Sequence, residues 1–234
     1  MECVATLEGH ECSVECLTYG DGLLYSGSYD GIIKVWKDFE CVGILKGQSG
    51  VLCLTYNNGL LYSGEIDNII QVWKDFECIA TLKDHTNIVN CLTYNEGLLY
   101  SGSCDQTIRV WKDFKCINIL KGHTGSVKCL TYNDGLLYSG CNDWNIKVWK
   151  NFECIATLKE HIYSAGCLIY NDGLLYSCGT QRIKVWKDFD CITVIESSND
   201  IYSMIYVDNL IYTGDFIGAI KAWKEIGKFT KRAL

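Results

Sequence analysis

The stretch GLLYSGSYDGIIKVWKDFEC, residues 22–41, decides the fold because the chain repeats it with few changes. It returns as GLLYSGEIDNIIQVWKDFEC (59–78), GLLYSGSCDQTIRVWKDFKC (97–116) and GLLYSGCNDWNIKVWKNFEC (135–154). Its tryptophan recurs every 37 or 38 residues, at positions 36, 73, 111, 149, 186 and 223, and only Trp144 falls outside the series. A period of this length is typical of repeat proteins, in which each unit buries its apolar face against its neighbours. The sequence therefore predicts one array of six units.

Each unit contains four short segments with the pattern of β-strands. In the first unit these are ECVATL (2–7), SVECLTY (13–19), LLYSGS (23–28) and IIKVW (32–36), and the turn GDG (20–22) joins the second to the third. Four strands joined by tight turns form a small antiparallel sheet, and here both of its faces are apolar. Because only neighbouring sheets can bury both faces, we expect an all-β, six-bladed β-propeller of four-stranded antiparallel blades.

The predicted propeller is a single domain over residues 1–226. Its repeats are expected at about 2–39, 40–76, 77–114, 115–152, 153–189 and 190–226, and a short basic C-terminal tail follows at 227–234. If each repeat begins with the outermost strand of the preceding blade, the last blade lacks that strand. We expect the N-terminal strand at 2–7 to supply it and to close the ring as a monomer. The tail, which is less apolar, is the alternative.

Composition narrows the classes of partner. The chain has 234 residues, a formal net charge of −7 that is spread along its length, and few arginines, which are Arg109, Arg182 and Arg232. A nucleic-acid-binding surface is therefore not expected. No apolar run is long enough to span a membrane, and the first residues have no signal-peptide pattern. We expect a cytoplasmic protein that does not bind membranes.

Most of the 15 cysteines occupy two repeat positions. One position holds Cys3, Cys41, Cys78, Cys116, Cys154 and Cys191, and the other holds Cys16, Cys53, Cys91, Cys129 and Cys167. Apolar, strand-like surroundings at both positions indicate small buried side chains in a reducing compartment. His10, Cys12 and Cys16 lie close together, but no paired C-x-x-C motif supports a zinc site. We predict no metal and no cofactor.

On these repeats the chain resembles the WD40-repeat (β-transducin-type) family over nearly its whole length. The resemblance implies a WD40-type propeller in which a His, a Ser or Thr, an Asp and a Trp form a buried, hydrogen-bonded tetrad. Three repeats supply all four residues: His10, Ser26, Asp30 and Trp36; His85, Ser101, Asp105 and Trp111; and His123, Ser139, Asp143 and Trp149.

The other three repeats depart from this pattern. Repeat two has Gln48 in place of the histidine, repeat five lacks the aspartate in a turn that is one residue shorter, and repeat six has Ile217 at the aspartate position. Every repeated tryptophan is followed by lysine instead of the aspartate that gives the family its name. Because one such hydrogen bond contributes only about 1 kcal/mol net, we expect these blades to form all the same.

The histidines argue against catalysis. All four, which are His10, His85, His123 and His161, fall at one repeat position, so none remains as a general base. Sets of Ser, His and Asp occur in several repeats, whereas an active site should occur once, and the arginines are not expected to converge. We predict a protein that is not an enzyme and has no catalytic residues. A six-bladed propeller hydrolase is the less favoured alternative.

The residues that determine function are expected at the positions where the six repeats differ from one another. One variable position, after the valine of the second strand, holds Glu15, Leu52, Asn90, Lys128, Gly166 and Tyr202. The other, before the tetrad aspartate, holds Tyr29, Ile66, Cys104, Asn142, Thr180 and Phe216, and Trp144 and Tyr163 are further candidates. In the WD40 family the face that carries these loops is the usual partner site, so the resemblance implies a protein or peptide partner bound there by aromatic anchors.

The predicted function is therefore a non-catalytic protein-interaction scaffold. Two alternatives remain open. The variable positions differ only through drift after recent duplication, or the repeats are the targeting or substrate-recognition domain of a larger kinase or ubiquitin-ligase polypeptide.

Overall fold

The structure, a computed structural model, describes residues 3–159 and 165–224. In these ranges the chain forms 23 β-strands and no helix, so no helix there is long and apolar enough to cross a membrane. The chain divides into two compact units, Met1–Lys121 (unit 1) and Gly122–Leu234 (unit 2). The single domain over 1–226 stays a prediction.

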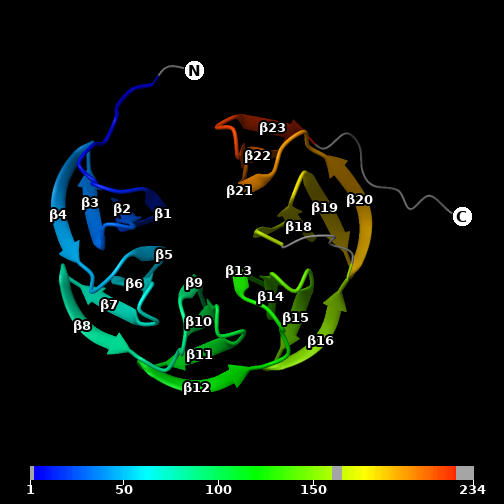
Figure 1. The fold of residues 1–234 in the computed structure, drawn as a ribbon, viewed down its shortest axis with the longest axis horizontal. Helices are drawn as coiled ribbons and strands as arrows, with labels where there is room; N and C mark the ends of the chain where they lie inside the picture. Colours follow the sequence, from blue (N-terminus) through cyan, green and yellow to red (C-terminus); the bar gives the residue numbers. More distant parts are fainter. Residues whose placement is uncertain (1–2, 160–164, 225–234) are drawn as a thin grey trace, which may run out of the picture. The chain divides into compact units, whose positions relative to one another are not determined.

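Unit 1 contains three four-stranded antiparallel sheets, blades 1, 2 and 3 (Figure 1). Blade 1 consists of β1 (Val14–Gly20), β2 (Leu23–Ser28), β3 (Ile32–Lys37) and β4 (Glu40–Lys46). Blade 2 consists of β5 (Val51–Asn57), β6 (Leu60–Glu65), β7 (Ile70–Lys74) and β8 (Glu77–Leu82). Blade 3 consists of β9 (Val89–Asn95), β10 (Leu98–Ser103), β11 (Ile108–Lys112) and β12 (Lys115–Leu120).

Unit 2 contains blades 4, 5 and 6. Blade 4 consists of β13 (Val127–Asn133), β14 (Leu136–Cys141), β15 (Ile146–Lys150) and β16 (Glu153–Leu158). Blade 5 consists of β17 (Cys167–Asn171), β18 (Leu174–Gly179), β19 (Arg182–Lys187) and β20 (Asp190–Glu196). Blade 6 consists of β21 (Ile201–Val207), β22 (Leu210–Asp215) and β23 (Ile220–Lys224).

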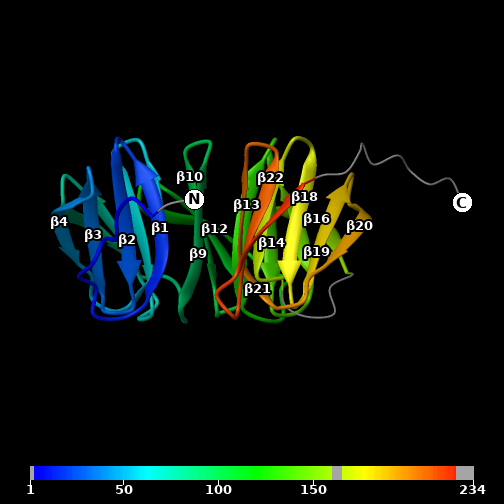
Figure 2. The ribbon, with the colours of Figure 1, turned by 90° about the horizontal axis from the view of Figure 1, so that it is seen from above.

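Strands pair in chain order within every blade, running up and down the sheet (Figure 2). The fourth strand of a blade comes from the start of the next repeat: β4, which contains ECVGIL, pairs with β3 of the repeat before it. The all-β fold and the blades predicted from the repeat are confirmed.

Two kinds of tight turn hold these hairpins. Asp21 and Gly22 join β1 to β2 with φ of 48° and 79°, as in the two-residue turns that suit the twist of a hairpin. Asp38 and Phe39 join β3 to β4 with φ of 48° and 68°, so a phenylalanine adopts a backbone conformation that usually belongs to glycine or asparagine. The first kind of turn follows from its glycine, whereas nothing local in KDFE predicts the second.

Apolar side chains from consecutive blades form the core of each unit. Between blades 1 and 2, Ile33 and Val35 from one side meet Val51 and Leu61 from the other, and all four are at most 2% exposed. Tyrosines stack at the same joints, for example Tyr25 on Tyr56 with ring centroids 5.5 Å apart. Both faces of a central blade are therefore buried, as its apolar strands require.

Gly64 of β6 has no room for a side chain, because the sulfur atom of Cys53 occupies the space beside it. A Cβ placed on Gly64 would lie 2.5 Å from Cys53 Sγ and 2.8 Å from Val89 Cγ1, which is closer than packed atoms approach. We expect Gly64→Ala to lower the free energy of unfolding by about 1–3 kcal/mol through overpacking. Urea unfolding measures this, with Ala substituted at the exposed residue Lys74 as control. A Gly64→Ala protein as stable as the wild type would contradict the packing described.

The N-terminal strand is where the prediction was wrong. Residues 3–13 contain no strand, Val4 is 83% exposed, and blade 6 has three strands among the described residues. Residues 3–7 therefore do not form the strand that was expected to complete the last blade. ECIATL at 77–82 becomes β8 because β7 and a tight turn immediately precede it. The closely similar CVATL at 3–7 is not a strand, so this local sequence does not suffice to make one.

Candidate partner-binding site

The two variable positions of a repeat lie at one end of its blade. The amide of Tyr29, in the turn after β2, donates to the carbonyl of Ser13, in the loop before β1, at 3.0 Å. The equivalent bonds join Ile66 to Gly50, Cys104 to Ile88, Asn142 to Ser126 and Phe216 to Asp200. One loop and one turn thus form a local two-segment surface on each of these five blades.

The first variable position is a β-bulge. In blade 1 the strand register shifts between Val14 and Cys16, which leaves Glu15 unpaired, and the same shift leaves Leu52 unpaired in blade 2. Asn90, Lys128 and Tyr202 occupy the bulges of blades 3, 4 and 6. A bulge re-aims its side chain away from the sheet pattern. The copies therefore differ at a position where the pairing of the strands is interrupted.

In unit 1 the contacts of the variable residues differ from blade to blade. In blade 3, Asn90 Nδ2 lies 3.2 Å from Cys104 Sγ. In blade 2 a Cβ on Gly50 would lie 2.5 Å from Ile66 Cδ1, so the Ile66 side chain covers that glycine. In blade 1, Glu15 accepts a hydrogen bond from Ser13, and Tyr29 is 56% exposed. Leu52 and Ile66 are half-buried, so Tyr29 is the one large apolar side chain that is exposed at the variable positions of unit 1.

Unit 2 has the more apolar surface. The rings of Tyr202 and Phe216 in blade 6 lie 6.0 Å apart, and the two side chains are 64% and 73% exposed. Ile217, which occupies the position of the missing aspartate and follows Phe216 in the chain, is 70% exposed. In blade 4, Lys128 is half-buried and Asn142 exposed. Tyr163 lies outside the described residues.

Trp144 of blade 4 has an unusual backbone. It is 57% exposed and has a φ of 68° in the turn between β14 and β15. The same turn position holds Gly31, Asn68, Gln106 and Gly218 in other blades, with φ between 70° and 86°. Glycine and asparagine tolerate this conformation, whereas a bulky residue in it stores strain of about 1–3 kcal/mol. The large exposed side chain is thus present in spite of its backbone cost.

Hydrogen-bonded tetrads support these loops in blades 1, 3 and 4. In blade 3, Trp111 Nε1 donates to Ser101 Oγ at 2.8 Å, His85 Nε2 lies 2.7 Å from the same oxygen, and His85 Nδ1 lies 2.6 Å from Asp105 Oδ2. Blade 1 joins Trp36, Ser26, His10 and Asp30 in this way, and blade 4 joins Trp149, Ser139, His123 and Asp143. The aspartate then accepts main-chain amides of the loop and the turn, for example those of Glu11 and Ile32 on Asp30.

Hydrogen bonding controls the charge of these groups. Burial raises the pKa of Asp30, but the amides of Glu11 and Ile32 outweigh it, so the pKa lies below its ordinary value. The same balance lowers the pKa of Asp143, where the amide of Thr124 and the ring of His123 donate. Burial lowers the pKa of His123, although Asp143 opposes this. The pair is therefore a neutral imidazole that donates to a carboxylate.

The tetrad has the connectivity of a Ser-His-Asp triad but not its accessibility. Ser101 is 0% exposed and its oxygen already accepts the indole N–H of Trp111. A nucleophile must reach a substrate atom, and this oxygen lies under the tryptophan. The arrangement supports loops and does not present a reactive group.

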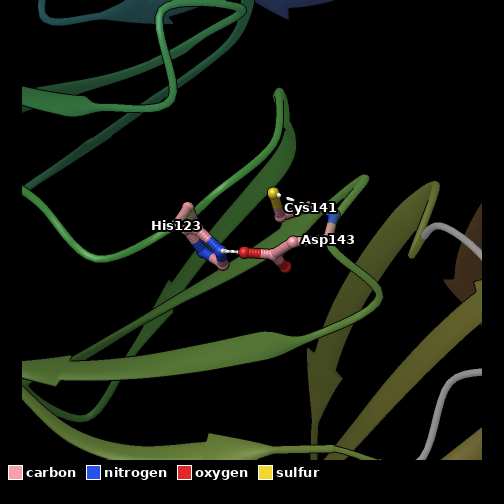
Figure 3. Close-up of side chains that lie close together, drawn as sticks. All are labelled: His123, Cys141 and Asp143. Carbon is pink, nitrogen blue, oxygen red and sulfur yellow. Dashed lines mark hydrogen bonds and ion pairs between the residues drawn. The ribbon is translucent and has the colours of Figure 1, made fainter.

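One group of metal-ligand type occurs in the part of the chain that the structure describes, namely His123, Cys141 and Asp143 of blade 4 (Figure 3). Its ligand atoms lie within 4.8 Å of one another, but each already has a hydrogen-bond partner. His123 binds Asp143 and Ser139, and Cys141 Sγ accepts the amide of Asp143 at 3.3 Å. Burial raises the pKa of the Cys141 thiol to about 12, which disfavours the thiolate that a metal needs. The geometry favours a structural role.

In blades 2 and 6, where the tetrad is incomplete, a carboxylate two residues before the tetrad-aspartate position binds the loop, and the sequence did not predict this role. Glu65 Oε2 accepts the amides of Gln48 and Ser49 at 3.0 and 3.1 Å, and its other oxygen lies 3.3 Å from Ser63 Oγ. In blade 6, Asp215 accepts from Asn199 and from the amide of Ala219, each at 2.8 Å. The signal was an acid at the position that holds Ser28 and Ser103 in blades 1 and 3.

The two substitute carboxylates differ in charge state. Burial raises the pKa of Glu65 to about 7, and the amides of Ser49 and Gln48 only partly oppose it. In contrast, the hydrogen bond from Asn199 and the nearby Lys221, 3.3 Å away, hold the pKa of Asp215 below its ordinary value. Blade 2 thus holds its loop with a carboxyl group that titrates near neutral pH.

The cysteines differ from one another in burial and in bonding. Of the first repeated set, Cys3, Cys41, Cys78 and Cys154 are exposed, so the expectation that they are buried was wrong. Cys41, Cys78 and Cys154 lie on β4, β8 and β16, which are edge strands of their sheets, whereas Cys3 lies before the first strand. In the second set Cys53 and Cys91 are buried and Cys16 and Cys129 half-buried, whereas Cys167 forms a disulfide with Cys178.

Antiparallel sheets of four short strands, packed face to face in chain order and tied by tetrads, define a β-propeller repeat protein. The WD domain, G-beta repeat (WD40) profile matches residues 1–37, 39–74, 76–112 and 114–150, which together exceed half of the chain. The chain belongs to the WD40 repeat family. The four matches fall on repeats one to four, and in the last two repeats the tetrad departs most from the pattern.

Solved structures agree with this fold. The chain is similar to the computationally designed Ika8 protein, with a TM-score of 0.79 and 26% identity over 93% of this chain and 73% of that one. It is also similar to the WD40 β-propeller domain of Doa1, with a TM-score of 0.78 and 24% identity over 94% of this chain and 85% of that one. No curated protein sequence matches the chain.

Proposed function

We propose that this WD40 protein is a non-catalytic scaffold that binds a protein or peptide partner through the loop ends of its blades. The bulge and turn residues that differ between repeats are exposed or half-buried there, whereas the tetrads beneath them have no accessible reactive atom. We further propose that the protein is cytoplasmic and that its partner is neither a nucleic acid nor a membrane.

Trp144 carries the proposal. Exposed tryptophan is common among residues that contribute most to protein binding. Here it lies in a turn where glycine or asparagine is less strained. A tryptophan that lowers the stability of the turn is not expected to persist through neutral drift alone. Tyr202, Phe216 and Ile217 of blade 6 add a second exposed apolar group in the same unit.

Trp144→Gly separates binding from folding. Because glycine relieves the left-handed strain, we expect the free energy of unfolding to stay the same or to rise by about 1 kcal/mol. We expect the affinity for a captured partner to fall at least tenfold, which corresponds to about 1.4 kcal/mol. Affinity capture from native cell extract identifies the partner, and calorimetry with the purified pair measures the change.

Phe152→Gly is the matched control. Phe152 belongs to the same blade, has a φ of 69°, and lies in the turn between β15 and β16, at the opposite end of β15 from Trp144. It should leave partner binding unchanged. Equal affinities of the wild type and Trp144→Gly would exclude this surface, and the Tyr202→Ala, Phe216→Ala double variant then tests blade 6 in the same assay.

The alternative in which these repeats target a larger kinase or ligase polypeptide makes a different prediction. A longer reading frame that continues from this chain would support it. Turnover of pooled hydrolase substrates, lost on a single substitution at the loop ends, would instead support a propeller hydrolase.

A further inference from the structure

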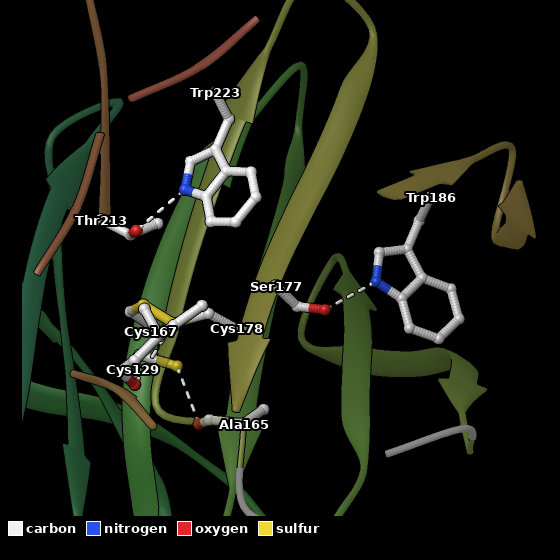
Figure 4. The surroundings of a disulfide bond; sticks show 9 residues. Cys129, Ala165, Cys167, Ser177, Cys178, Trp186, Thr213 and Trp223 are labelled. Carbon is white, nitrogen blue, oxygen red and sulfur yellow. Dashed lines mark hydrogen bonds between the residues drawn. A yellow bond between two sulfur atoms is a disulfide. The ribbon is translucent and has the colours of Figure 1, made fainter. Parts of the chain in front are cut away.

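Blade 5 contains a disulfide where other blades have a cysteine opposite a glycine. Cys167 of β17 and Cys178 of β18 are paired residues, with Cα atoms 5.4 Å apart (Figure 4). Cys167 occupies the repeat position of Cys16, Cys53, Cys91 and Cys129. Cys178 occupies the position of Gly27, Gly64, Gly102 and Gly140. One glycine-to-cysteine change thus distinguishes blade 5 at this site.

The other blades show why the position is glycine. A Cβ would lie 2.6 Å from the Sγ of Cys16 if placed on Gly27, and 2.5 Å from the Sγ of Cys129 if placed on Gly140. The repeated thiol therefore fills the space above the glycine. Two unbonded thiols do not fit in that space, whereas a covalent bond brings the two sulfur atoms closer than thiols can pack. The Cys178 side chain is accommodated through its bond to Cys167.

The bond lies in the core between blades 5 and 6. Cys178 is 0% exposed and packs in one cluster with Tyr176, Ile201 and Met204, and the half-buried Cys167 packs against that cluster. Blade 5 also lacks the tetrad aspartate, although Trp186 still donates to Ser177 at 2.8 Å (Figure 4). The disulfide joins β17 to β18, whereas the tetrad of blade 1 joins the loop before β1 to β2, β3 and the turn between them.

We propose that the Cys167–Cys178 pair is a redox-controlled tie that stabilises blades 5 and 6 when oxidised and loosens their packing when reduced. Oxidation by a disulfide such as glutathione disulfide balances in two exchanges. The Cys167 thiolate attacks glutathione disulfide and releases one glutathione thiolate, and the Cys178 thiolate then displaces the second from the mixed disulfide. Cys167 is half-buried whereas Cys178 is fully buried, so we expect a small thiol to react at Cys167 first. The proposal does not depend on any partner.

Thermal unfolding of the full chain with and without a phosphine reductant tests the tie. We expect reduction to lower the unfolding midpoint of the wild type by about 5 °C or more, as loss of a disulfide does in a chain of this length. Cys178→Gly gives blade 5 the residue of its sister blades, so its midpoint should not respond to reductant, although it keeps all the other cysteines. It thereby controls for reduction elsewhere.

Alkylation and a second substitution at Cys178 test the disulfide independently of the reductant. Alkylation of the native, air-purified protein followed by peptide mass measurement should leave Cys167 and Cys178 unmodified until reductant is added. Cys178→Ser, which keeps a Cβ opposite the Cys167 thiol, should unfold at a lower temperature than Cys178→Gly. A wild-type midpoint that does not respond to reductant, or alkylation of both cysteines before reduction, would overturn the proposal.

Discussion

Replacing Ser101 with alanine is expected to lower the free energy of unfolding by about 2–4 kcal/mol, because two buried groups lose their partner. Ser101 Oγ accepts the indole N–H of Trp111 at 2.8 Å and lies 2.7 Å from His85 Nε2. Trp111 and His85 are only 3% and 5% exposed, so water does not replace the lost hydroxyl. Chemical denaturation, monitored by tryptophan fluorescence and circular dichroism, measures the change.

A double-mutant cycle isolates the hydrogen bond. Trp111→Phe removes the indole N–H, so Ser101→Ala should cost less in that background, with a coupling energy of about 0.5–3 kcal/mol. Ser13→Ala removes the hydroxyl of an exposed serine and should change stability by less than about 0.5 kcal/mol. Additive effects of Ser101→Ala and Trp111→Phe would mean that the tetrad bond contributes nothing measurable.

The second large effect is a dependence of stability on pH that is due to Glu65. Its pKa is about 7 in the folded chain against 4.5 for an ordinary glutamate, so the folded state binds the additional proton between these values. The stabilisation is complete below pH 4.5 and is lost as the pH rises through 7. A shift of this size corresponds to roughly 3 kcal/mol. We therefore expect Glu65 to make the protein less stable at pH 8 than at pH 5.

Glu65→Gln tests this by difference. The stability of the variant minus that of the wild type should rise between pH 5 and pH 8, toward about 3 kcal/mol, because the amide does not ionise. The difference is needed because His123, whose pKa is lowered by burial, acts in the opposite direction below pH 6.5. The low pKa values of Asp30 and Asp143 affect stability only in more acidic solution. Glu77→Gln, at an exposed carboxylate, should give a constant difference; a constant difference for Glu65→Gln as well would refute the assignment.

Glu65 also connects this titration to the candidate partner surface. Its carboxylate holds the amides of Gln48 and Ser49, and Ser49 Oγ in turn accepts the amide of Asp67 in the facing turn. Leu52 and Ile66, two of the predicted partner residues, flank these segments. The pH at which Glu65 ionises is therefore the pH at which the hydrogen bonding of this loop changes.

The candidate site could be predicted only in part. The variable positions were found because the copies disagree there, and the structure shows that one of them is a bulge. That Ile217 joins Tyr202 and Phe216 at an exposed surface was not predicted, because its position was read only as a lost aspartate. The role of Glu65 was not predicted either, because repeat two keeps its aspartate, Asp67, and an additional acid has no evident role until the loop amides that it accepts are located.

Local sequence determined the number of blades, the positions of the strands in repeats one to six after residue 13, and the turns at Asp21–Gly22 and its copies. These features depend on residues adjacent in the chain, so a repeated pattern suffices. Tertiary structure alone decided that residues 3–7 form no strand although the similar residues 78–82 do. It also decided which carboxylate binds each loop, and that Cys167 bonds to Cys178 whereas Cys129 faces Gly140. Each of these depends on which atoms meet across strands or blades, and near-identical segments acquire different partners there.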